Sequence, residues 1–249
     1  MRFIYFTLII VMFYQCKQEN STWQTNTTDK GLPYRSFYPE AYKKGETLPL
    51  LLFLHGAGER GDDNESQLVH IAPLLSSDSL QNINPCILIF PQCPEDDYWA
   101  HVNRGGGQWT VESSESPTPA MQEVMSILDK VLDDPQVDKT RLYISGLSMG
   151  GFGTFDLLSR KPTLFAAAVP ICGGADTTKV DQYAHVPLWN FHGAIDPVVP
   201  VELSQDFISN FIEVGGNPRY TEYHDGEHNI WDRAYKEPQL LTWLFKQKK

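Results

Sequence analysis

The sequence predicts an α/β fold with a mostly parallel central sheet covered by helices on both faces. Two observations predict it. Apolar runs of strand length, such as Leu48–Leu54 and residues 86–90, are continuous rather than alternating, which is typical of strands buried on both faces of a parallel sheet. Segments with helical spacing of apolar residues separate these runs, as in successive β-α-β units. With 249 residues, 41% of them hydrophobic, the chain is long enough for one such domain.

The expected elements follow one another from residue 32 onward. Residues 34–38 are expected to form a short edge strand, and residues 95–119, rich in Gly, Ser and Trp, a long excursion over the sheet. A helix over residues 121–132 is expected to begin after Thr118 and Pro119, which are typical of a helix start. Further strands are expected at residues 141–145, 166–171, 187–191 and 220–223, and further helices at residues 152–158, 203–212 and 240–245.

The first 15 residues are expected to be a secretory signal peptide and not part of the fold. One positive charge precedes an apolar run that is shorter than the about 20 residues needed to span a bilayer. The alternatives are an uncleaved anchor or a buried strand. Cys16 follows the run and precedes a polar stretch, which resembles a bacterial lipoprotein signal, although residues 13–15 depart from its usual small-residue pattern. We therefore expect a lipidated N-terminus and polar tether over residues 16–30, one domain over residues 31–249, and a protein that is exported and held at a membrane by lipid alone.

The net charge and the cysteine spacing limit which partners and metal sites we expect. The formal net charge is −11, and an acidic surface repels phosphate backbones, so nucleic acid is not an expected partner. The three cysteines after Cys16 match no zinc or redox spacing, and no metal is expected. We interpret Cys86, Cys93 and Cys172 as buried free thiols, with Cys86 and Cys93 too far apart to pair across a strand.

The candidate nucleophile is Ser148. The strand at residues 141–145 leads into Gly146-Leu147-Ser148-Met149-Gly150 and then into a helix, which is the strand–turn–helix setting of the G-x-S-x-G elbow. Gly146 and Gly150 allow the strand and helix to approach closely, because neither has a side chain. The turn also places Ser148 at a helix N-terminus, where backbone N–H groups favour developing negative charge. A serine hydroxyl needs a base near neutral pH, and the base needs an acid that orients it.

The candidate acid is Asp196. In α/β-hydrolases the acid follows the serine along the chain and precedes the histidine. Asp196 comes just after the strand at residues 187–191, at the strand end where such sheets carry catalytic groups. Asp196-Pro197 is also a plain turn signal. Two other acidic residues compete for the role but follow a strand less directly, namely Asp176 and Asp181.

The candidate base is His228. Of the seven histidines, only His224 and His228 follow Asp196. His224 directly adjoins the strand at residues 220–223, where we expect sheet packing to hold it. His228 lies in the loop beyond that strand and can reach the strand ends, so the sequence favours it as the general base.

The glycine-rich turn after Leu48–Leu54 is the candidate oxyanion loop. The strand ends in His55-Gly56-Ala57-Gly58, and in this fold such a turn supplies one backbone donor to the oxyanion. We assign that donor to Ala57, with Gly58 as the alternative. The second donor is the N–H of the residue after the nucleophile, Met149.

Seven short motifs together carry a family resemblance. The sequence resembles the bacterial "predicted peptidase" branch of the α/β-hydrolases, close to the polyhydroxybutyrate depolymerases, feruloyl esterases and acetyl xylan esterases. The resemblance implies an α/β-hydrolase fold and Ser148, Asp196 and His228 as a catalytic triad. The motifs, in chain order, are LHGAGERG (54–61), PQCP (91–94), GLSMGGFGTFD (146–156), AAAVPICGG (166–174), FHGAIDPVVP (191–200), GGNPRYTEY (215–223) and HNIWD (228–232).

The function expected from these residues is ester hydrolysis by an exported serine hydrolase without a cofactor. The resemblance adds an accessory esterase acting on plant polysaccharide, with acetyl or feruloyl esters as substrates. Three tryptophans in loops could rim the pocket and contact the substrate: Trp99, Trp109 and Trp231. Two alternatives stay open, a serine peptidase with the same triad and a non-catalytic glycan-binding protein on a hydrolase scaffold. The oligomeric state is not predicted.

Overall fold

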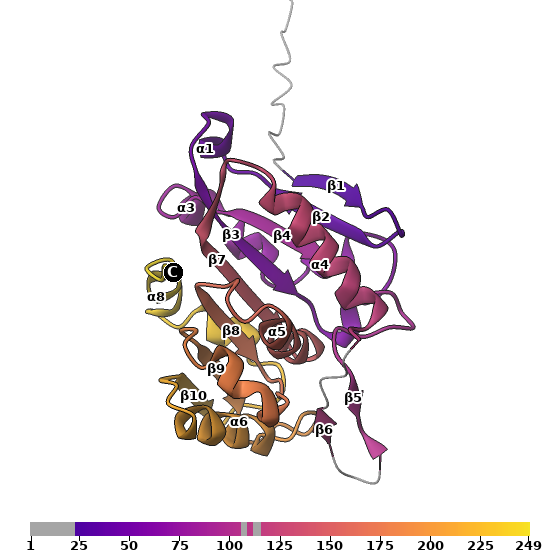
Figure 1. The fold of residues 1–249 in the computed structure, drawn as a ribbon, viewed down its shortest axis with the longest axis vertical. Helices are drawn as coiled ribbons and strands as arrows, with labels where there is room; N and C mark the ends of the chain where they lie inside the picture. Colours follow the sequence, from indigo (N-terminus) through magenta and orange to yellow (C-terminus); the bar gives the residue numbers. More distant parts are fainter. Residues whose placement is uncertain (1–22, 106–108, 112–115) are drawn as a thin grey trace, which may run out of the picture.

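The structure is a computed structural model that describes residues 23–105, 109–111 and 116–249. Its centre is an eight-stranded sheet in the order β1-β2-β4-β3-β7-β8-β9-β10 (Figure 1). Strand β2 runs antiparallel to both of its neighbours, and every other adjacent pair is parallel. The strands are β1 (Trp23–Thr27), β2 (Pro33–Phe37), β3 (Leu48–Leu54), β4 (Ile87–Pro91), β7 (Val137–Leu147), β8 (Ala167–Ile171), β9 (Trp189–Gly193) and β10 (Arg219–Tyr223).

Helices cover both faces of this sheet, as the sequence predicts. Alternate residues of β3 divide between two hydrophobic cores: Leu50, Leu52 and Leu54 join one, and Leu51 and Phe53 join the other. The first core is closed by α4 (Pro119–Leu132), α5 (Met149–Arg160) and α6 (Glu202–Glu213), and the second by α2 (Ala72–Leu75), α7 (Trp231–Tyr235) and α8 (Leu240–Leu244). Two further short helices, α1 (Glu40–Lys43) and α3 (Asp78–Gln81), lie near the N-terminal strands.

The predicted start of α4 is confirmed in detail. Pro119 is the first helical residue, and the Thr118 hydroxyl accepts a hydrogen bond from the N–H of Met121, which caps the helix. The Asp97 carboxylate accepts from the N–H of Ala120 at 2.7 Å. The first turn of α4 is therefore tied to the excursion that precedes it.

The sequence prediction is wrong about where the folded region begins. Residues 23–27, expected to belong to the tether, form β1 at the edge of the sheet, so the strand at Pro33–Phe37 is not an edge strand. The tether looked polar because only one side chain of β1 is a large apolar one. Trp23 packs edge-on against Phe37 at 5.3 Å and against Phe90 at 5.5 Å, and these contacts hold the strand in place.

The excursion over residues 95–119 contains a small hairpin, β5 (Val102–Asn103) and β6 (Thr110–Val111), which projects beside α6 (Figure 1). Cys86, Cys93 and Cys172 are buried free thiols, as expected. The expected signal peptide and Cys16 lie outside the described residues. Among the helices of the described part, none is both long and apolar enough to cross a membrane.

Candidate active site

The turn between β7 and α5 holds Ser148 in a strained conformation. Its φ is 51° and its ψ is −116°, outside the regions that side-chain-bearing residues normally adopt, and its N–H is held by the carbonyl of Ile171 at 2.8 Å. Glycine is required on both sides. A Cβ on Gly150 would lie 1.9 Å from the carbonyl oxygen of Leu54, and one on Gly146 would lie 2.2 Å from that of Gly150. The strand end and the helix start can meet only because these side chains are absent.

The structure brings Ser148, Asp196 and His228 together from three separate strand ends. The Ser148 Oγ lies 2.9 Å from Nε2 of His228, and Nδ1 of His228 lies 2.7 Å from Oδ2 of Asp196. Because the carboxylate only accepts, Nδ1 carries the hydrogen and Nε2 is free to accept the serine hydroxyl proton. This is the tautomer that general-base catalysis requires. Ser148 is half-buried and the His228 side chain is 17% exposed, so both can be reached from outside.

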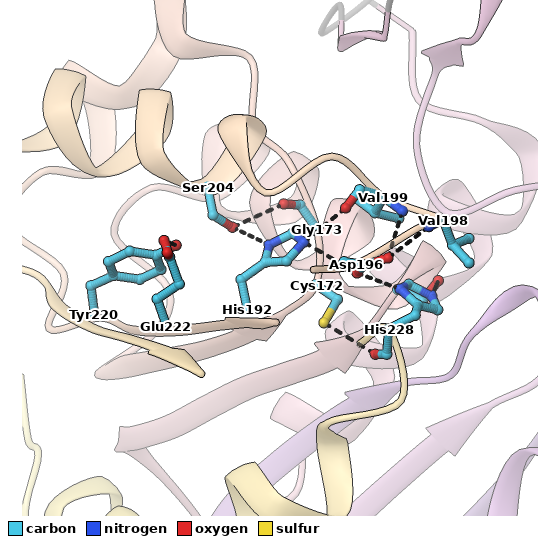
Figure 2. Close-up of polar contacts among 11 residues, drawn as sticks. Cys172, Gly173, His192, Asp196, Val198, Val199, Ser204, Tyr220, Glu222 and His228 are labelled. Carbon is cyan, nitrogen blue, oxygen red and sulfur yellow. Dashed lines mark hydrogen bonds and ion pairs between the residues drawn. The ribbon is translucent and has the colours of Figure 1, made fainter. Parts of the chain in front are cut away.

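The Asp196 carboxylate is fully buried and fully hydrogen-bonded (Figure 2). The backbone N–H groups of Val198 and Val199 donate to Oδ1 at 2.8 and 2.9 Å, and Oδ2 faces the imidazoles of His228 and His192. Burial alone would raise the pKa of this carboxyl. The hydrogen bonds from two imidazoles and two backbone amides outweigh burial and hold the pKa well below its usual range. Asp196 therefore stays ionised wherever His228 can act as a base.

The other candidates for acid and base have different positions. His224 is 93% exposed and lies 3.7 Å from the Asp225 carboxylate, so our expectation that sheet packing would hold it is wrong. The Asp176 carboxylate caps a 3₁₀ turn by accepting from the N–H of Thr178, and Asp181 is exposed within that turn.

The expected oxyanion loop faces the nucleophile. A Cβ on Gly56 would lie 3.6 Å from Cβ of Ser148, so the two turns are in direct contact. Ala57 and Met149 are each the first residue of a helical turn, a position whose backbone N–H has no acceptor inside the helix. Of the two predicted donors, Met149 thus directly follows Ser148, and Ala57 directly follows the glycine that faces it.

His55 fixes the start of this loop from within the core. Its Nε2 accepts from the N–H of Cys93 at 2.9 Å, so Nδ1 carries the hydrogen and donates to the carbonyl of Gly56 at 2.6 Å. Burial lowers the pKa of His55 to about 4. The ring therefore stays neutral at ordinary pH and keeps both hydrogen bonds.

The three tryptophans expected at the rim lie in different environments. Trp99 is completely buried and its indole N–H donates to the carbonyl of His55 at 3.0 Å, so the prediction that it contacts substrate is wrong. The Gly-rich sequence around Trp99 does not indicate that this side chain fills the core beside Gly153. A Cβ on Gly153 would lie 2.5 Å from Cβ of Trp99. Trp109 is partly exposed and stacks on Phe152 at 5.8 Å. Trp231 is partly exposed and meets the His228 ring edge-on at 5.7 Å.

A second group of side chains at the site was not predicted. Cys172 Sγ, His192 and Asp196 present ligand atoms within 4.8 Å of one another, a spacing that could hold a metal ion. Each already has a hydrogen-bonding role: the thiol donates to the carbonyl of His228 at 3.3 Å, and burial raises its pKa far above the range in which it would lose its proton to a metal. The pairing of His192 with Asp196 at i and i+4 in the HGAID motif is the signal that could have found this group.

Comparison with known proteins identifies the family. The phospholipase/carboxylesterase family profile matches residues 41–239. The chain belongs to this family. The α/β-hydrolase fold and the family resemblance that the sequence predicts are thereby confirmed.

Individual relatives point in the same direction. The crystal structure of a thermostable esterase superimposes with a TM-score of 0.80 and 37% identity, over 91% of this chain and 63% of that one. The bifunctional acetylxylan esterase/xylanase XynS20E of Neocallimastix patriciarum is 26% identical over 196 residues, which are 78% of this chain and 26% of that protein. This chain therefore spans less than two-thirds of the length of either relative.

More distant structures share the fold alone. A ferulic acid esterase superimposes with a TM-score of 0.66 at 16% identity, over 90% of this chain and 96% of that one. The dipeptidyl peptidase 4 of Porphyromonas gingivalis gives a TM-score of 0.65 at 15% identity, over 90% of this chain and 35% of that one. The same scaffold thus occurs in esterases and peptidases, and the choice between them depends on the site.

Proposed function

We propose that this protein is a serine esterase that hydrolyses carboxylic esters through an acyl-enzyme intermediate. One observation carries the proposal: the His228 imidazole bridges Ser148 Oγ and Asp196 Oδ2 at 2.9 and 2.7 Å, in the tautomer that a general base needs. The carboxylesterase family to which the chain belongs supports esters as the substrate class.

The reaction consumes one water and releases one acid and one alcohol. His228 takes the hydroxyl proton as Ser148 Oγ bonds to the ester carbonyl carbon, and the N–H groups of Ala57 and Met149 stabilise the oxyanion. The ester C–O bond then breaks, and the alcohol leaves with the proton from His228. Water, deprotonated by the same imidazole, releases the acid and restores the serine. Asp196 holds the ring and stabilises its cation throughout.

We further propose that the natural substrate is an acetyl or feruloyl ester carried on plant polysaccharide. The names of two relatives, an acetylxylan esterase/xylanase and a ferulic acid esterase, support this class. The nucleophile and the base are both open to the surface, and Trp231 lies beside the base, where an aromatic acid or a sugar ring would meet an indole. Trp109 is the second proposed contact.

The proposed cellular location is the outer face of a bacterial membrane or the periplasm, with a lipid on Cys16 as the anchor. The apolar run that precedes this cysteine supports export. Metabolic labelling with a radioactive fatty acid tests the anchor, with Cys16→Ser as the control. Equal labelling of both chains, or no labelling of either, would contradict it.

Hydrolysis of a small panel tests the activity: p-nitrophenyl acetate and butyrate, methyl ferulate, acetylated xylan and an aminoacyl-p-nitroanilide, each with Ser148→Ala beside the unaltered chain. The expected result is release from the esters that requires the serine, with little from the anilide. Faster serine-dependent release from the anilide would make the protein a peptidase. No turnover and no labelling by a fluorophosphonate would indicate a non-catalytic glycan-binding protein.

A further inference from the structure

A second imidazole contacts the proposed catalytic acid from the side opposite to the base (Figure 2). His192, the fourth residue of β9, directs Nε2 to within 3.3 Å of Oδ2 of Asp196, the same oxygen that receives His228. The His192 side chain is completely buried, so no substrate can touch it. Any role in the reaction must therefore act through Asp196.

The hydrogen bonds of His192 fix its tautomer. Nε2 lies between two groups that only accept, the carbonyl of Val199 at 3.1 Å and the carboxylate of Asp196, so this nitrogen carries the hydrogen. Nδ1 lies 2.6 Å from the hydroxyl of Ser204, which donates to it. His192 and His228 thus face the same carboxylate oxygen as donors through opposite ring nitrogens.

Ser204 connects His192 to helix α6 and to the end of β8. It lies in α6, is completely buried, and its Oγ is also 3.3 Å from the carbonyl of Gly173, just beyond β8. Because Nε2 of His192 carries the ring hydrogen, Nδ1 can only accept, and the hydroxyl hydrogen of Ser204 is directed to Nδ1 at 2.6 Å and not to the more distant carbonyl.

The ionisable groups around His192 come from three strands. Asp196 follows β9, Cys172 follows β8, and Glu222 lies opposite His192 in the register of β10. The Glu222 carboxylate accepts hydrogen bonds from the hydroxyl of Tyr220 at 2.6 Å and from the side-chain amide of Gln205 at 2.9 Å. Asp196 is the carboxylate nearest to Nε2 of His192, at 3.3 Å, and it shares that N–H with the carbonyl of Val199 at 3.1 Å.

We propose that His192 is a positioning residue for the reaction, and that its Nε2–H holds the Asp196 carboxylate in the rotamer that aligns His228 while Ser204 fixes its tautomer. The proposal rests on the proposed esterase function. Without His192, the two amide bonds would still hold Oδ1, but Oδ2 would have no fixed partner on the side opposite to His228 and could turn away from the base. The turnover number would then fall, and KM would not, because the substrate contacts none of these atoms.

Two amide substitutions separate positioning from packing. Glutamine carries an amide nitrogen at about the reach of Nε2, whereas asparagine ends near Nδ1 and leaves Asp196 without this donor. We expect His192→Asn to lower kcat about 10-fold or more, and His192→Gln to recover most of it, with KM within about twofold in both. The low-pH limb of kcat/KM should move to lower pH in His192→Asn. The reason is that the Asp196 carboxylate is then held less firmly beside His228 and stabilises its cation less. Equal losses in both variants, or an unmoved limb, would overturn the proposal.

A matched pair on α6 covers the possibility that His192 variants fail to fold. Ser204→Ala removes the hydroxyl at Nδ1, and Ser209→Ala makes the same change at an exposed serine, whose hydroxyl donates to the carbonyl of Gln205 in the same helix. We expect only Ser204→Ala to lower kcat and move the pH limb. Wild-type activity in Ser204→Ala, with an unmoved limb, would contradict the assigned role.

A spectroscopic readout keeps this inference separate from the proposed function. In ¹⁵N spectra of the inactive Ser148→Ala chain, His192 should show a protonated Nε2 and a bare Nδ1, and Ser204→Ala should shift only the Nδ1 signal strongly. If the protein hydrolyses no ester, the proposed function fails while this result still tests the contact. A protonated Nδ1 with a bare Nε2 would overturn the inference even in an active esterase.

Discussion

The indole N–H of Trp99 donates to the backbone carbonyl of His55 at 3.0 Å, across 44 positions of the chain. This bond joins the long excursion after β4 to the residue that directly follows β3, at the start of the candidate oxyanion loop. Both side chains are buried, and their rings meet edge-on at 5.2 Å. The excursion is thus a support of the oxyanion loop as well as a cover over the sheet.

Trp99→Phe should therefore affect stability and activity together. The change keeps a ring in the core but leaves the buried carbonyl of His55 without its donor, which typically costs about 1–3 kcal/mol. Urea unfolding should report this loss, and kcat should fall because the oxyanion loop is less firmly held. Trp109→Phe is the control for the unfolding measurement, since Trp109 is partly exposed and a phenylalanine can still stack on Phe152. If Trp109→Phe loses as much as Trp99→Phe, the assigned support is wrong.

His55 should make the free energy of unfolding depend on pH between about 6.5 and 4. The unfolded imidazole takes up a proton near 6.5, whereas burial lowers the pKa of the folded one to about 4. The stability is thus fully present above pH 6.5 and falls as the pH drops toward 4. One pKa unit corresponds to about 1.4 kcal/mol, so the loss approaches about 3 kcal/mol.

The measurement is urea unfolding at several pH values within that window. His55→Asn should flatten the slope whatever its own stability, and His224→Asn, at an exposed histidine, should leave it unchanged. Asp196 makes the free energy of unfolding depend on pH in a lower range. Its pKa is depressed in the folded protein, so the stability that it contributes is lost only as the pH falls below the ordinary value of 3.8. A slope in His55→Asn equal to that of the unaltered chain would contradict the assignment to His55.

The sequence was sufficient to find the three proposed catalytic side chains because each lies where a local signal is strong. Ser148 sits in a glycine elbow between a strand and a helix, Asp196 follows a buried strand, and His228 is one of two histidines after it. Chain order and strand ends then bring the three together without any knowledge of side-chain packing.

Other features depend on contacts between distant segments and could not be predicted in the same way. The burial of Trp99 depends on the β3 end and on α5, and the polar strand Trp23–Thr27 is held by Trp23 against Phe37 and Phe90. The role of His192 depends on a serine 12 positions away on α6. Periodicity and motif spacing contain no information about such pairs.

Trp231→Ala should raise KM for substrates with an aromatic acid or a sugar, and leave p-nitrophenyl acetate almost unaffected. The indole lies beside His228, and an aromatic contact of about 0.5–1.5 kcal/mol corresponds to an increase in KM of about 2–13-fold. Steady-state kinetics with methyl ferulate and acetylated xylan provide the measurement. Trp109→Ala is the matched comparison at the other proposed contact. An increase in KM with Trp109→Ala alone would indicate that the substrate binds near the β5–β6 hairpin and not beside Trp231.

Gly56→Ala and Gly58→Ala form a matched pair that tests the oxyanion loop. A Cβ on Gly56 would lie 2.7 Å from Cδ1 of Leu147 and 3.0 Å from Oε2 of Glu59, so either these side chains or the loop beside Ser148 must shift, and Leu147 is buried and closely packed. A Cβ on Gly58 would have no heavy atom within 4 Å. Removing an oxyanion donor outright costs about 10²–10³ in rate, so the displaced loop of Gly56→Ala should lower kcat about 10-fold or more, with Gly58→Ala close to normal.

The rate of labelling by a fluorophosphonate should fall in parallel in Gly56→Ala, because its phosphoryl oxygen uses the same donors. Thermal unfolding of both variants provides the control for folding. Equal activity in the two variants, with Gly56→Ala folded, would mean that the Ala57 N–H does not stabilise the oxyanion. A loss confined to Gly58→Ala would favour the N–H of Gly58 as the donor, because that change acts on the loop without disturbing the packing at Leu147.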